Sequence, residues 1–311
     1  MADASVSTTK AWLMAARPQT LPAAAAPVVV GTGLAVHEGV FAPLPALAAL
    51  VGAALIQVGT NFANDYYDAV KGADTEDREG FTRVTQSGLI RPAAVKRAMY
   101  LTFLAAIVVG VYLVYVGGVP ILVVGLLSVA SGIAYTGGPY PLGYHGLGDL
   151  FVFVFFGLVA VTGTYYVQAV TYLADPLSTT LRPEALPLVA VVASLPVAAL
   201  STDILVVNNV RDRETDAATG KRTLAVRLGY FWSRVEYLAM LALAYLVPVA
   251  LWAGFGFSPA VCLPLLTLPL AMQVARTVLT ETSGEALNPA LERTGQLLAA
   301  YALLFAVGFA L

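Results

Sequence analysis

The sequence contains few cysteines and histidines, and this scarcity excludes several kinds of site. Cys262 is the only cysteine among the 311 residues, so the chain carries neither a disulfide framework nor a thiolate metal site. The two histidines, His37 and His145, lie in short polar or glycine-containing segments, which argues against haem ligation by paired histidines inside a membrane. The net charge of −2 gives no indication of a nucleic-acid partner.

Charged residues are scarce as well. They make up 12% of the chain, whereas a soluble domain carries about 25%. Hydrophobic residues make up 59%, and their runs are long enough for helices to cross the hydrocarbon core of a bilayer. Because the chain lacks the polar residues to cover a water-facing surface, we expect a multi-pass protein of the cell membrane, in contact with lipid.

The apolar runs predict an all-α protein with nine transmembrane helices in a single domain that spans residues 1–311. Gly284 and Pro289 favour a loop in the polar stretch that separates the last two runs. The nine predicted segments are 19–36, 44–64, 93–115, 119–136, 148–171, 186–209, 231–254, 258–279 and 293–311.

The distribution of lysine and arginine predicts the orientation of these helices. If the N-terminus is cytoplasmic, the long polar connections 65–92 and 210–230 and the loop before the ninth helix are cytoplasmic too. All 17 lysines and arginines except Arg182 then fall on that side. An excess of basic residues in cytoplasmic loops is typical of membrane proteins. We therefore expect the N-terminus and both polar connections to lie in the cytoplasm.

Each long polar connection begins with an Asn/Asp cluster at the end of a helix. In the first cluster, the polar residues recur at spacings of three and four, which predicts one shared helix face. They are Gln57, Asn61, Asn64, Asp65 and Asp68. The second cluster shows the same spacing at the end of the sixth helix. Its members are Asn208, Asp212 and Asp216.

Two acidic helix ends on one side of the membrane would repel each other unless a cation lay between them. Mg²⁺ fits, because it typically takes one or two carboxylates and shares its other positions with substrate phosphates. Basic residues that could neutralise the rest of a diphosphate follow both clusters. They are Lys71, Arg78, Arg83, Lys221 and Arg222. The alternative is two solvated helix ends whose acids pair with loop arginines, but the recurrence of the pattern favours a Mg²⁺–diphosphate site.

The pattern Asn64-Asp65-x-x-Asp68, followed by Asp212-x-x-x-Asp216, resembles the UbiA superfamily of intramembrane prenyltransferases. Further stretches look like its MenA-type 1,4-dihydroxy-2-naphthoate branch, and the resemblance covers nearly the whole chain. They include ARPQTLPAAAAPVVVGTG (16–33), KGADTEDREGFTRVTQSGLI (71–90) and AYTGGPYPLGYHGLGDLFVFVFFG (134–157). The resemblance implies nine helices around a central cavity that opens to lipid, with two Mg²⁺ ions bridging a prenyl diphosphate to both motifs.

The resemblance also implies a reaction and a set of site residues. A polyprenyl group would pass from its diphosphate to an aromatic hydroxy acid, with loss of CO₂ and pyrophosphate, giving demethylmenaquinol for menaquinone synthesis. The expected metal ligands are Asn64, Asp68, Asp212 and Asp216, and the expected catalytic acids are Asp65, Asp68, Asp212 and Asp216. Many family members carry another acid four residues after Asp68, where this chain has Gly72, so the role of Asp74 stays open.

Other residues are candidates for contact with the substrates. Asn208, Tyr135 and Tyr140 are expected to bind substrate together with the basic residues named above. Aromatic faces could stabilise an allylic cation, although a place in the interfacial aromatic belt is the alternative for each tyrosine. Arg17 is either a topological anchor or a contact for the carboxylate of the acceptor. The remaining candidate tyrosines are Tyr66, Tyr67, Tyr144, Tyr165 and Tyr166.

Two further acids are expected to be structural. Asp203 lies nine positions before Asp212, which places it on the opposite face of an ideal helix and outside the metal cavity. We expect it to pair with a serine, threonine or tyrosine of a neighbouring helix. Asp149 precedes a helix after a glycine-rich loop, where an acid commonly stabilises the helix N-terminus.

Two alternative functions remain at this point. One is a prenyltransferase for another aromatic acceptor, of the 4-hydroxybenzoate or homogentisate type. The other is an ion-coupled transporter, although transporters place ionisable residues near the midplane of the membrane. Here the acids cluster at helix ends beside arginine-rich loops, which favours phosphate chemistry.

Overall fold

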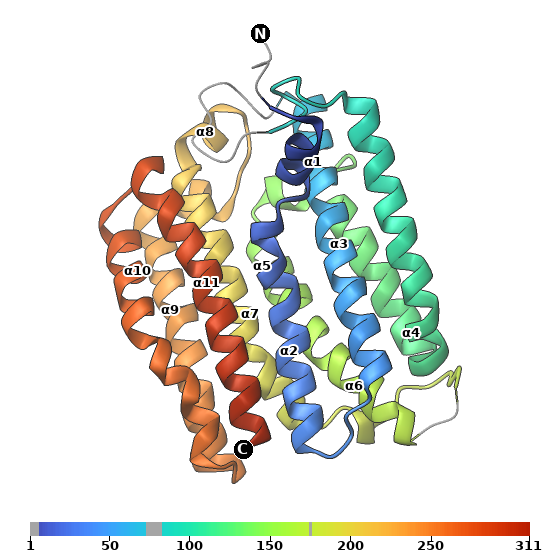
Figure 1. The fold of residues 1–311 in the computed structure, drawn as a ribbon. Helices are drawn as coiled ribbons and strands as arrows, with labels where there is room; N and C mark the ends of the chain where they lie inside the picture. Colours follow the sequence, from blue (N-terminus) through green and yellow to red (C-terminus); the bar gives the residue numbers. More distant parts are fainter. Residues whose placement is uncertain (1–5, 73–82, 174–175) are drawn as a thin grey trace.

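The computed structural model describes residues 6–72, 83–173 and 176–311, and these residues form helices and no strand. They build a bundle of long helices (Figure 1). In chain order the α-helices are α1 (Thr8–Ala16), α2 (Leu21–His37), α3 (Pro43–Val70), α4 (Pro92–Ala134), α5 (Gly148–Val152), α6 (Ala160–Leu173), α7 (Leu188–Arg211), α8 (Arg213–Ala218), α9 (Leu224–Phe255), α10 (Leu268–Thr280) and α11 (Gly284–Ala310). The short helices are η1 (Pro18–Thr20), η2 (Leu142–His145), η4 (Pro183–Ala185), η5 (Pro259–Thr267) and the π-helix η3 (Phe153–Val159), which joins α5 to α6.

Eight helical stretches of the described residues are long and apolar enough to cross a membrane. One of them, α4, contains two of the predicted segments, because Gly118 has φ 71° and ψ −160° and interrupts the helix. This backbone conformation is open to glycine at little cost, and Pro120 follows it. The two arms of α4 run in opposite directions (Figure 1). The nine predicted segments are therefore all helical, and the predicted fold class is confirmed.

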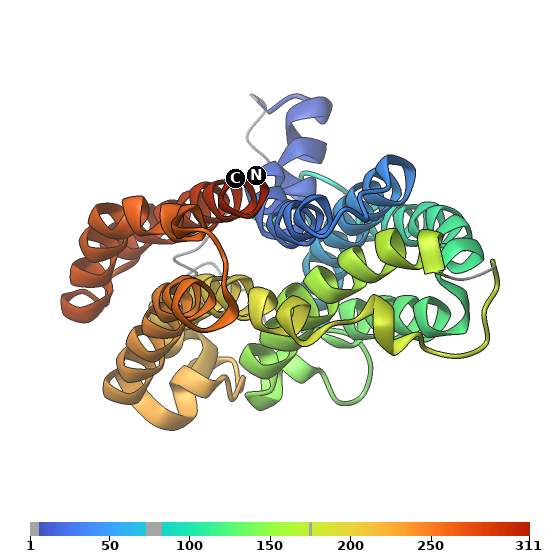
Figure 2. The same cartoon turned by 90° about the horizontal axis from the view of Figure 1, so that it is seen from below.

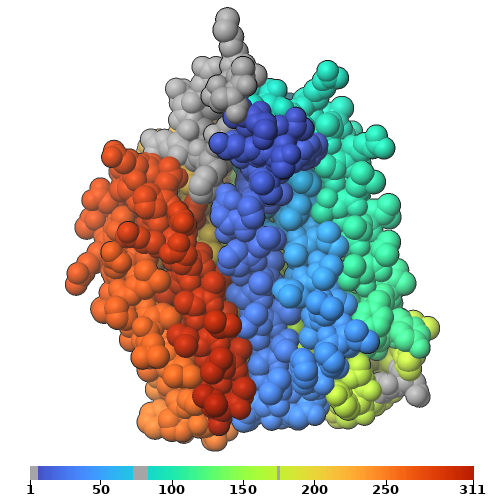
Figure 3. All heavy atoms as spheres, viewed as in Figure 1, coloured from blue at the N-terminus to red at the C-terminus, as the bar shows by residue number. Residues whose placement is uncertain are grey.

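Helices α2 and α11 lie side by side and pack against each other (Figure 2). On the face shown in Figure 3, the surfaces of α2 and α11 touch over their lower part. Leu34, Tyr301 and Phe305 are fully buried in the same hydrophobic core. Elsewhere α2 packs against α3 and α6, and α7 packs against α9. The first and last long helices thus close the bundle.

Long apolar side chains remain on the outer surface. On α4, Leu101, Leu104 and Val108 are more than half exposed, and a patch of this kind would be costly to expose to water. Helices satisfy their own backbone hydrogen bonds, so they can present such side chains to lipid. The chain is therefore a multi-pass membrane protein.

The polar connections gather at one end of the bundle. Helices α1 and α8, the end of α3 and the start of α5 all lie there, whereas the C-terminus and the connection from α6 to α7 lie at the other end (Figure 1). The connection from α6 to α7 contains Arg182, the one basic residue that the charge distribution placed on the opposite side. The two acidic clusters therefore end at the same level of the structure.

Candidate active site

A cavity of about 760 Å³ lies between α3, both arms of α4, η3, α6 and α7. Most of its wall is apolar and includes Ile56, Val114 and Phe155. The charged and amide residues of the wall come from Arg17 at the end of α1, from the later turns of α3 and α7, and from the segments that follow these two helices. The acidic and amide residues of that wall are Gln57, Asn61, Asn64, Asp68, Asn208, Asn209, Asp212 and Asp216, and the basic residues are Arg17, Arg83 and Lys221.

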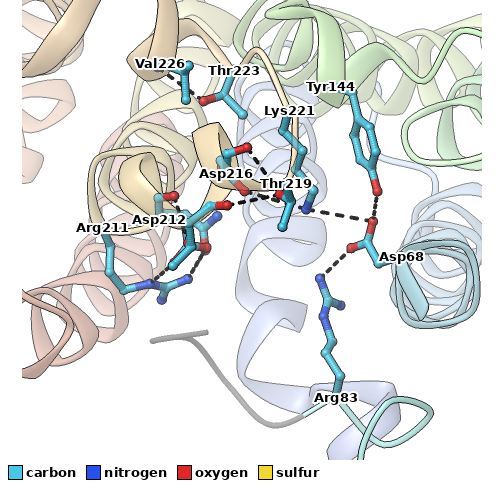
Figure 4. A network of polar contacts seen from close by, with 12 residues as sticks. Asp68, Arg83, Tyr144, Arg211, Asp212, Asp216, Thr219, Lys221, Thr223 and Val226 are labelled. Carbon is cyan, nitrogen blue, oxygen red and sulfur yellow. Dashed lines mark hydrogen bonds and ion pairs between the residues drawn. The ribbon is translucent and has the colours of Figure 1, made fainter. Parts of the chain in front are cut away.

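Asp68 lies near the end of α3, and its carboxylate is contacted by the side chains of three other residues. Its side chain is 2% exposed. The hydroxyl of Tyr144 donates to Oδ1 over 2.5 Å, and Nη2 of Arg83 donates to Oδ2 over 2.9 Å. The Nζ of Lys221 lies 3.9 Å from Oδ1 (Figure 4). Three segments distant in sequence therefore converge on one carboxylate.

The second motif surrounds a brief break in the helix. α7 ends at Arg211 and α8 begins at Arg213, so Asp212 lies at the junction. Nε of Arg211 donates to Oδ1 of Asp212 over 2.7 Å, and Nη2 donates to Oδ2 over 2.8 Å. The same guanidinium also bonds to Oδ1 of Asn208 over 2.7 Å and to Oδ1 of Asn288 on α11 over 2.9 Å. Arg211 thus ties the second motif to α11.

Lys221 lies between the two motifs. Gly220, with φ 81°, ends the turn after α8, and Thr223 then caps the start of α9 by accepting from the N–H of Val226 over 3.4 Å. This turn brings Nζ of Lys221 to 3.6 Å from Asp216 and to the position near Asp68 described above (Figure 4). A buried ammonium group therefore offsets the repulsion between the two acidic helix ends.

Asp65 was predicted to share a helix face with the other polar residues of the first motif, but its side chain does not face the cavity. It does not belong to the cavity wall, and its Oδ2 accepts hydrogen bonds from the backbone N–H of Thr85 over 3.2 Å and from the Thr85 hydroxyl over 2.7 Å. Its neighbours Asn64 and Asp68 do line the cavity. At 100° per residue, the side chains of Asp65 and Asp68 point about 60° apart around the helix axis. This separation lets Asp65 face Thr85 while Asp68 faces the cavity.

The three tyrosines near the first motif have different surroundings. Tyr135 lines the cavity, and burial raises the pKa of its phenol, as do the nearby carboxylates, so the hydroxyl stays protonated. Tyr140, predicted to bind substrate, is 56% exposed, stacks on His145 and lies outside the cavity wall. Tyr144 lines the cavity. Its ring lies 4.9 Å from Nζ of Lys221 and 5.2 Å from Nζ of Lys71.

Of the remaining basic candidates that the structure describes, Arg17 lines the cavity, and Lys71 and Arg222 do not. Arg17 lines it, and its carbonyl accepts from the hydroxyl of Thr20 over 2.9 Å. Lys71 lies outside the wall and donates to the carbonyl of Thr136 over 2.6 Å. Burial lowers the pKa of Lys71, with Asp68 acting in the opposite direction. Arg222 is exposed and lies outside the wall, and Arg78 and Asp74 lie outside the described residues.

Two other acids are buried away from the cavity wall. Asp203 lies outside the wall, as predicted, but neither of its carboxylate oxygens has a hydrogen-bond partner among the described residues. The prediction that Asp203 pairs with a serine, threonine or tyrosine of a neighbouring helix is therefore wrong. Asp149 is also buried behind the wall, at the start of α5.

The polar wall fits Mg²⁺. Within the described parts of the chain, no three acidic, histidine or cysteine side chains lie close enough to hold one ion by themselves. Mg²⁺ does not require such a cage, because it takes one or two carboxylates and completes its shell with phosphate and water oxygens. Asp68, Asp212 and Asp216 supply such oxygens on two facing walls. The position of Lys221 shows that a positive charge is favoured between them.

Two residues were not singled out as site residues from the sequence. Arg211 was considered only as one of the cytoplasmic charges, although it directly precedes Asp212. Thr136 belongs to no spacing pattern, yet its hydroxyl donates to Oδ1 of Asn64 over 3.0 Å. The position of Arg211 next to a motif acid was a usable signal, whereas Thr136 lies 72 residues from its partner and could not be paired with it in advance.

The fold and the site together define a helical membrane protein with carboxylates and cations at one end of an apolar cavity. The model of the UbiA prenyltransferase family matches residues 24–294. The chain belongs to the UbiA prenyltransferase family and is a prenyltransferase. The family assignment decides against the ion-coupled transporter.

Known proteins resemble the chain over nearly its full length. The chain is 42% identical to the 1,4-dihydroxy-2-naphthoate octaprenyltransferase of Escherichia coli (strain K12), over 99% of this chain and 97% of that protein. Its fold is similar to the apo structure of a UbiA homolog from Aeropyrum pernix K1, with a TM-score of 0.67, 14% identity and coverage of 92% and 96%. It is also similar to a UbiA homolog from Archaeoglobus fulgidus bound to GPP and Mg²⁺, with a TM-score of 0.62, 14% identity and coverage of 95% and 99%.

Proposed function

We propose that the protein transfers a polyprenyl group from a polyprenyl diphosphate to 1,4-dihydroxy-2-naphthoate, and that this reaction yields demethylmenaquinol for menaquinone synthesis. The observation that carries this proposal is the 42% identity, over 99% of the chain, with an enzyme named for this acceptor. The cavity supports it, because a polar wall of acids and cations adjoins an apolar space suited to an isoprenoid chain.

The two acidic motifs would hold the diphosphate end of the donor. Lys221 and Arg83 line the cavity and can bind phosphate oxygens in place of, or in addition to, the acids they contact. Asp68, Asp212 and Asp216 would hold Mg²⁺, whose bound form neutralises the diphosphate and makes pyrophosphate a better leaving group. The UbiA homolog from Archaeoglobus fulgidus that was solved with GPP and Mg²⁺ has a similar fold, which supports this assignment.

The reaction balances without an added oxidant or base. The allylic C–O bond breaks and its electron pair leaves with pyrophosphate. The acceptor carbon that bears the carboxylate forms the new C–C bond, and loss of CO₂ then returns the electrons of the broken C–C bond to the aromatic ring. The apolar wall keeps water from the allylic cation, and the faces of Tyr135 and Tyr144 can stabilise its charge.

Arg17 would bind the acceptor. It lines the cavity at the junction of α1 and η1, where its backbone adopts φ 52° and ψ 64°. A guanidinium group binds a carboxylate through two parallel hydrogen bonds, which would fix the orientation of the naphthoate ring. Arg17 follows α1, whereas Lys221 follows α8, so we propose that the two substrates are held by residues from different segments of the chain.

A product assay tests the proposal directly. Purified protein is incubated with Mg²⁺, a polyprenyl diphosphate and a panel of aromatic acids, and the products are identified by mass. We expect the prenylated, decarboxylated naphthalene from 1,4-dihydroxy-2-naphthoate and none after removal of divalent ions with EDTA. A product from 4-hydroxybenzoate or homogentisate alone would assign the other acceptor class, and undiminished turnover in EDTA would remove the role of the metal.

We also propose that residues 1–311 act as one domain with the N-terminus and the active-site end in the cytoplasm. The support is the distribution of basic residues and their location at one end of the bundle. Ala217 on α8 is exposed at that end. In a Cys262→Ala background, Ala217→Cys should resist impermeant thiol reagents in intact cells and react in inverted vesicles. Labelling from outside the cell would reverse the orientation.

A further inference from the structure

The cavity continues from the polar wall into the hairpin that the two arms of α4 form. Residues on both sides of the Gly118 turn line it. Among the described residues, none of α9, α10 or α11 belongs to the wall, and α2 packs against α11. The cavity therefore lies on the α4 side of the protein, and α4 itself lies at the edge of the bundle (Figure 1).

Two glycines are opposite each other across this hairpin. A β-carbon at Gly132 would lie 3.6 Å from Cζ of Phe103, which shows how the two arms pair at that level. Gly110 and Gly125 each lie seven residues closer to the turn. Seven residues make nearly two full turns of helix, so Gly110 shares a face with Phe103, and Gly125 shares a face with Gly132. The two glycines consequently face each other at one depth.

No side chain fills the gap between Gly110 and Gly125. Among the described residues, no heavy atom beyond the adjacent helix backbone lies within 4 Å of the position that a β-carbon would take at either glycine, and both glycines line the cavity. Toward the turn the gap ends where Ile121 packs against Gly117, and toward the polar wall it ends at the ring of Phe103. This bounded opening between Gly110 and Gly125 is the α4 slot.

Exposed apolar side chains flank the α4 slot. Val111 is 64% exposed and Leu126 is 60% exposed, although both belong to the cavity wall. Ile107 and Leu122 show the same combination. A side chain enclosed within a narrow cavity would keep little accessible surface, so these four residues lie where the cavity meets the outer surface of the protein. The α4 slot is therefore an apolar opening in the cavity wall.

The depth of the α4 slot determines what it opens onto. Gly110 and Gly125 are eight and seven residues from Gly118, which corresponds to roughly 10–12 Å along each arm. The hydrocarbon core of a bilayer is about 30 Å thick, so an opening at this distance from the end of the hairpin faces lipid acyl chains. It can pass an apolar chain without admitting water to the polar wall.

The cavity is too small for a whole polyprenyl donor together with its acceptor. A cavity of about 150 Å³ accommodates one benzene molecule, so 760 Å³ has room for roughly thirty carbon-sized atoms. The naphthoate and the diphosphate would take up most of that space. Part of a polyprenyl chain must then lie outside the cavity.

The distance from the polar wall to the α4 slot determines which donors reach it. A β-carbon at Gly52 on α3 would lie 3.8 Å from Val109, the neighbour of Gly110, so Gly52 marks the level of the slot. Asp68 lies sixteen residues further along α3, which corresponds to about 24 Å. A geranyl chain is shorter than this distance, whereas an octaprenyl chain is longer. Only a long donor therefore extends through the slot.

We propose that the α4 slot is the passage through which the distal isoprene units of the prenyl donor leave the cavity for the lipid, and that Gly110 and Gly125 allow the protein to bind long donors. This inference rests on the proposed function in requiring a prenyl diphosphate whose diphosphate lies at the polar wall. The continuity of the cavity from Asp68 to Gly110 carries it. Because units beyond the slot lie in the membrane, the site sets no upper limit on chain length.

A side chain placed in the slot should discriminate between long and short donors. Binding of non-reactive thiolodiphosphate analogues of geranyl and octaprenyl diphosphate is measured by calorimetry with Mg²⁺ and without acceptor. We expect Gly110→Leu and Gly125→Leu each to raise the Kd of the octaprenyl analogue about tenfold, because the new side chain occupies the path of the chain. The Kd of the geranyl analogue should stay within about twofold of wild type, since its chain ends before the slot.

Gly254→Leu is the matched control for these variants. Gly254 lies on α9, is exposed, has open space at its β-carbon position and does not line the cavity, so both Kd values should stay at wild type. An unchanged octaprenyl Kd in the Gly110→Leu/Gly125→Leu double variant would overturn the inference, as would an equal rise for both analogues. If neither analogue bound the wild-type protein, the proposed function itself would be wrong, and this inference with it.

Photolabelling of the wild-type protein tests the passage without any variant that has to fold. An octaprenyl diphosphate with a diazirine near the middle of its chain is bound and irradiated, and the labelled peptides are identified by mass spectrometry. We expect the label on α4, at or beside Ile107, Val111, Leu122 or Leu126. A label found only on other helices would overturn the inference. No acceptor enters these measurements, so failure of the product assay with dihydroxynaphthoate would leave them unaffected.

Discussion

The first and second acidic motifs resemble each other in sequence but are supported in different ways. Asp68 in the first motif is held by Tyr144, Arg83 and Lys221, which are brought to it by three other segments of the chain. Asp212 in the second motif is held through both oxygens by Arg211, the residue immediately before it. Asp68 is therefore contacted directly by distant segments, whereas Asp212 is contacted by a neighbour in sequence that itself bonds to Asn288 on α11.

This difference affects how each motif can respond to substrate. The partners of Asp68 line the cavity themselves, so Arg83 and Lys221 can exchange a carboxylate for a phosphate oxygen without leaving the site. Arg211 lies behind the wall and is bound to Asn208 and Asn288 as well. We therefore interpret the first motif as the adaptable half of the site and the second motif as the fixed half.

The largest effects should come from removal of the cavity acids, whichever motif they belong to. Asp68→Ala and Asp212→Ala should each lower kcat/KM on the order of a thousandfold or more, because the leaving pyrophosphate loses its electrostatic stabilisation. Turnover is measured by product mass, and the melting temperature in detergent checks folding. If one variant kept near-wild-type turnover, the motif that contains it would lie outside the chemistry and the comparison would lose its basis.

Smaller effects, confined to one substrate, should follow from the cations of the adaptable half. Lys221→Met and Arg83→Met remove partners of a charged group in a partly desolvated site, a loss of roughly 1.5–3 kcal/mol. We expect the KM for the polyprenyl diphosphate to rise about ten- to a hundredfold, with the KM for dihydroxynaphthoate nearly unchanged. Steady-state kinetics with each substrate varied in turn measures both constants.

Arg17→Ala provides the reciprocal control for these variants. It should raise the KM for dihydroxynaphthoate and leave that for the diphosphate nearly constant, since we propose that Arg17 binds the carboxylate of the acceptor. If Arg17→Ala changed neither constant, Arg17 would be a topological anchor only. If Arg17→Ala raised the KM for the polyprenyl diphosphate as much as Lys221→Met, the binding regions for the two substrates would not be separate.

The sequence predicted the secondary structure well, for a clear physical reason. Each membrane crossing needs a long apolar run, and a helix is the simplest structure that satisfies its own backbone in lipid, so the nine runs identify nine helical segments. The sharp turn at Gly118 was also detectable, because the apolar pattern breaks between 115 and 119. The charge pattern likewise separated Arg182 from the other basic residues, and the fold places it at the opposite end.

The details of the site were less predictable, because they depend on which side chains meet across the bundle. Periodicity grouped Asp65 with Asp68, but the segment around Thr85 provides two hydrogen bonds that hold Asp65 away from the cavity. Tyr140 and Tyr144 are four residues apart in one loop, and only the fold shows that Tyr144 reaches Asp68 while Tyr140 stacks on His145. Spacing defines helix faces, but it does not identify partners from distant segments.

Tyr144→Phe tests the remote support of Asp68 with a modest expected effect. The substitution removes the hydroxyl that bonds to Oδ1 and keeps the ring beside Lys221 and Lys71. Since Arg83 and Lys221 still hold the carboxylate, we expect a loss of about 1 kcal/mol, or about fivefold in kcat/KM. Tyr140→Phe is the matched control in the same loop and should stay within about twofold of wild type. Equal losses in both variants would indicate a general loop effect.

The smallest effect on activity is expected from Asp65→Asn, which distinguishes the two acids of the first motif. The introduced amide would keep an oxygen that can accept from Thr85, so the loop is retained while the negative charge is lost. We expect kcat/KM within about threefold of wild type and a lower melting temperature, because hydrogen bonds to a charged acceptor contribute about 1 kcal/mol more than neutral ones. Asp65→Ala should lower the melting temperature further, since the buried N–H of Thr85 then loses its acceptor. A loss of turnover in Asp65→Asn comparable to that of Asp68→Ala, with the melting temperature unchanged, would return Asp65 to the catalytic role that the sequence predicted and make the first motif a two-acid site.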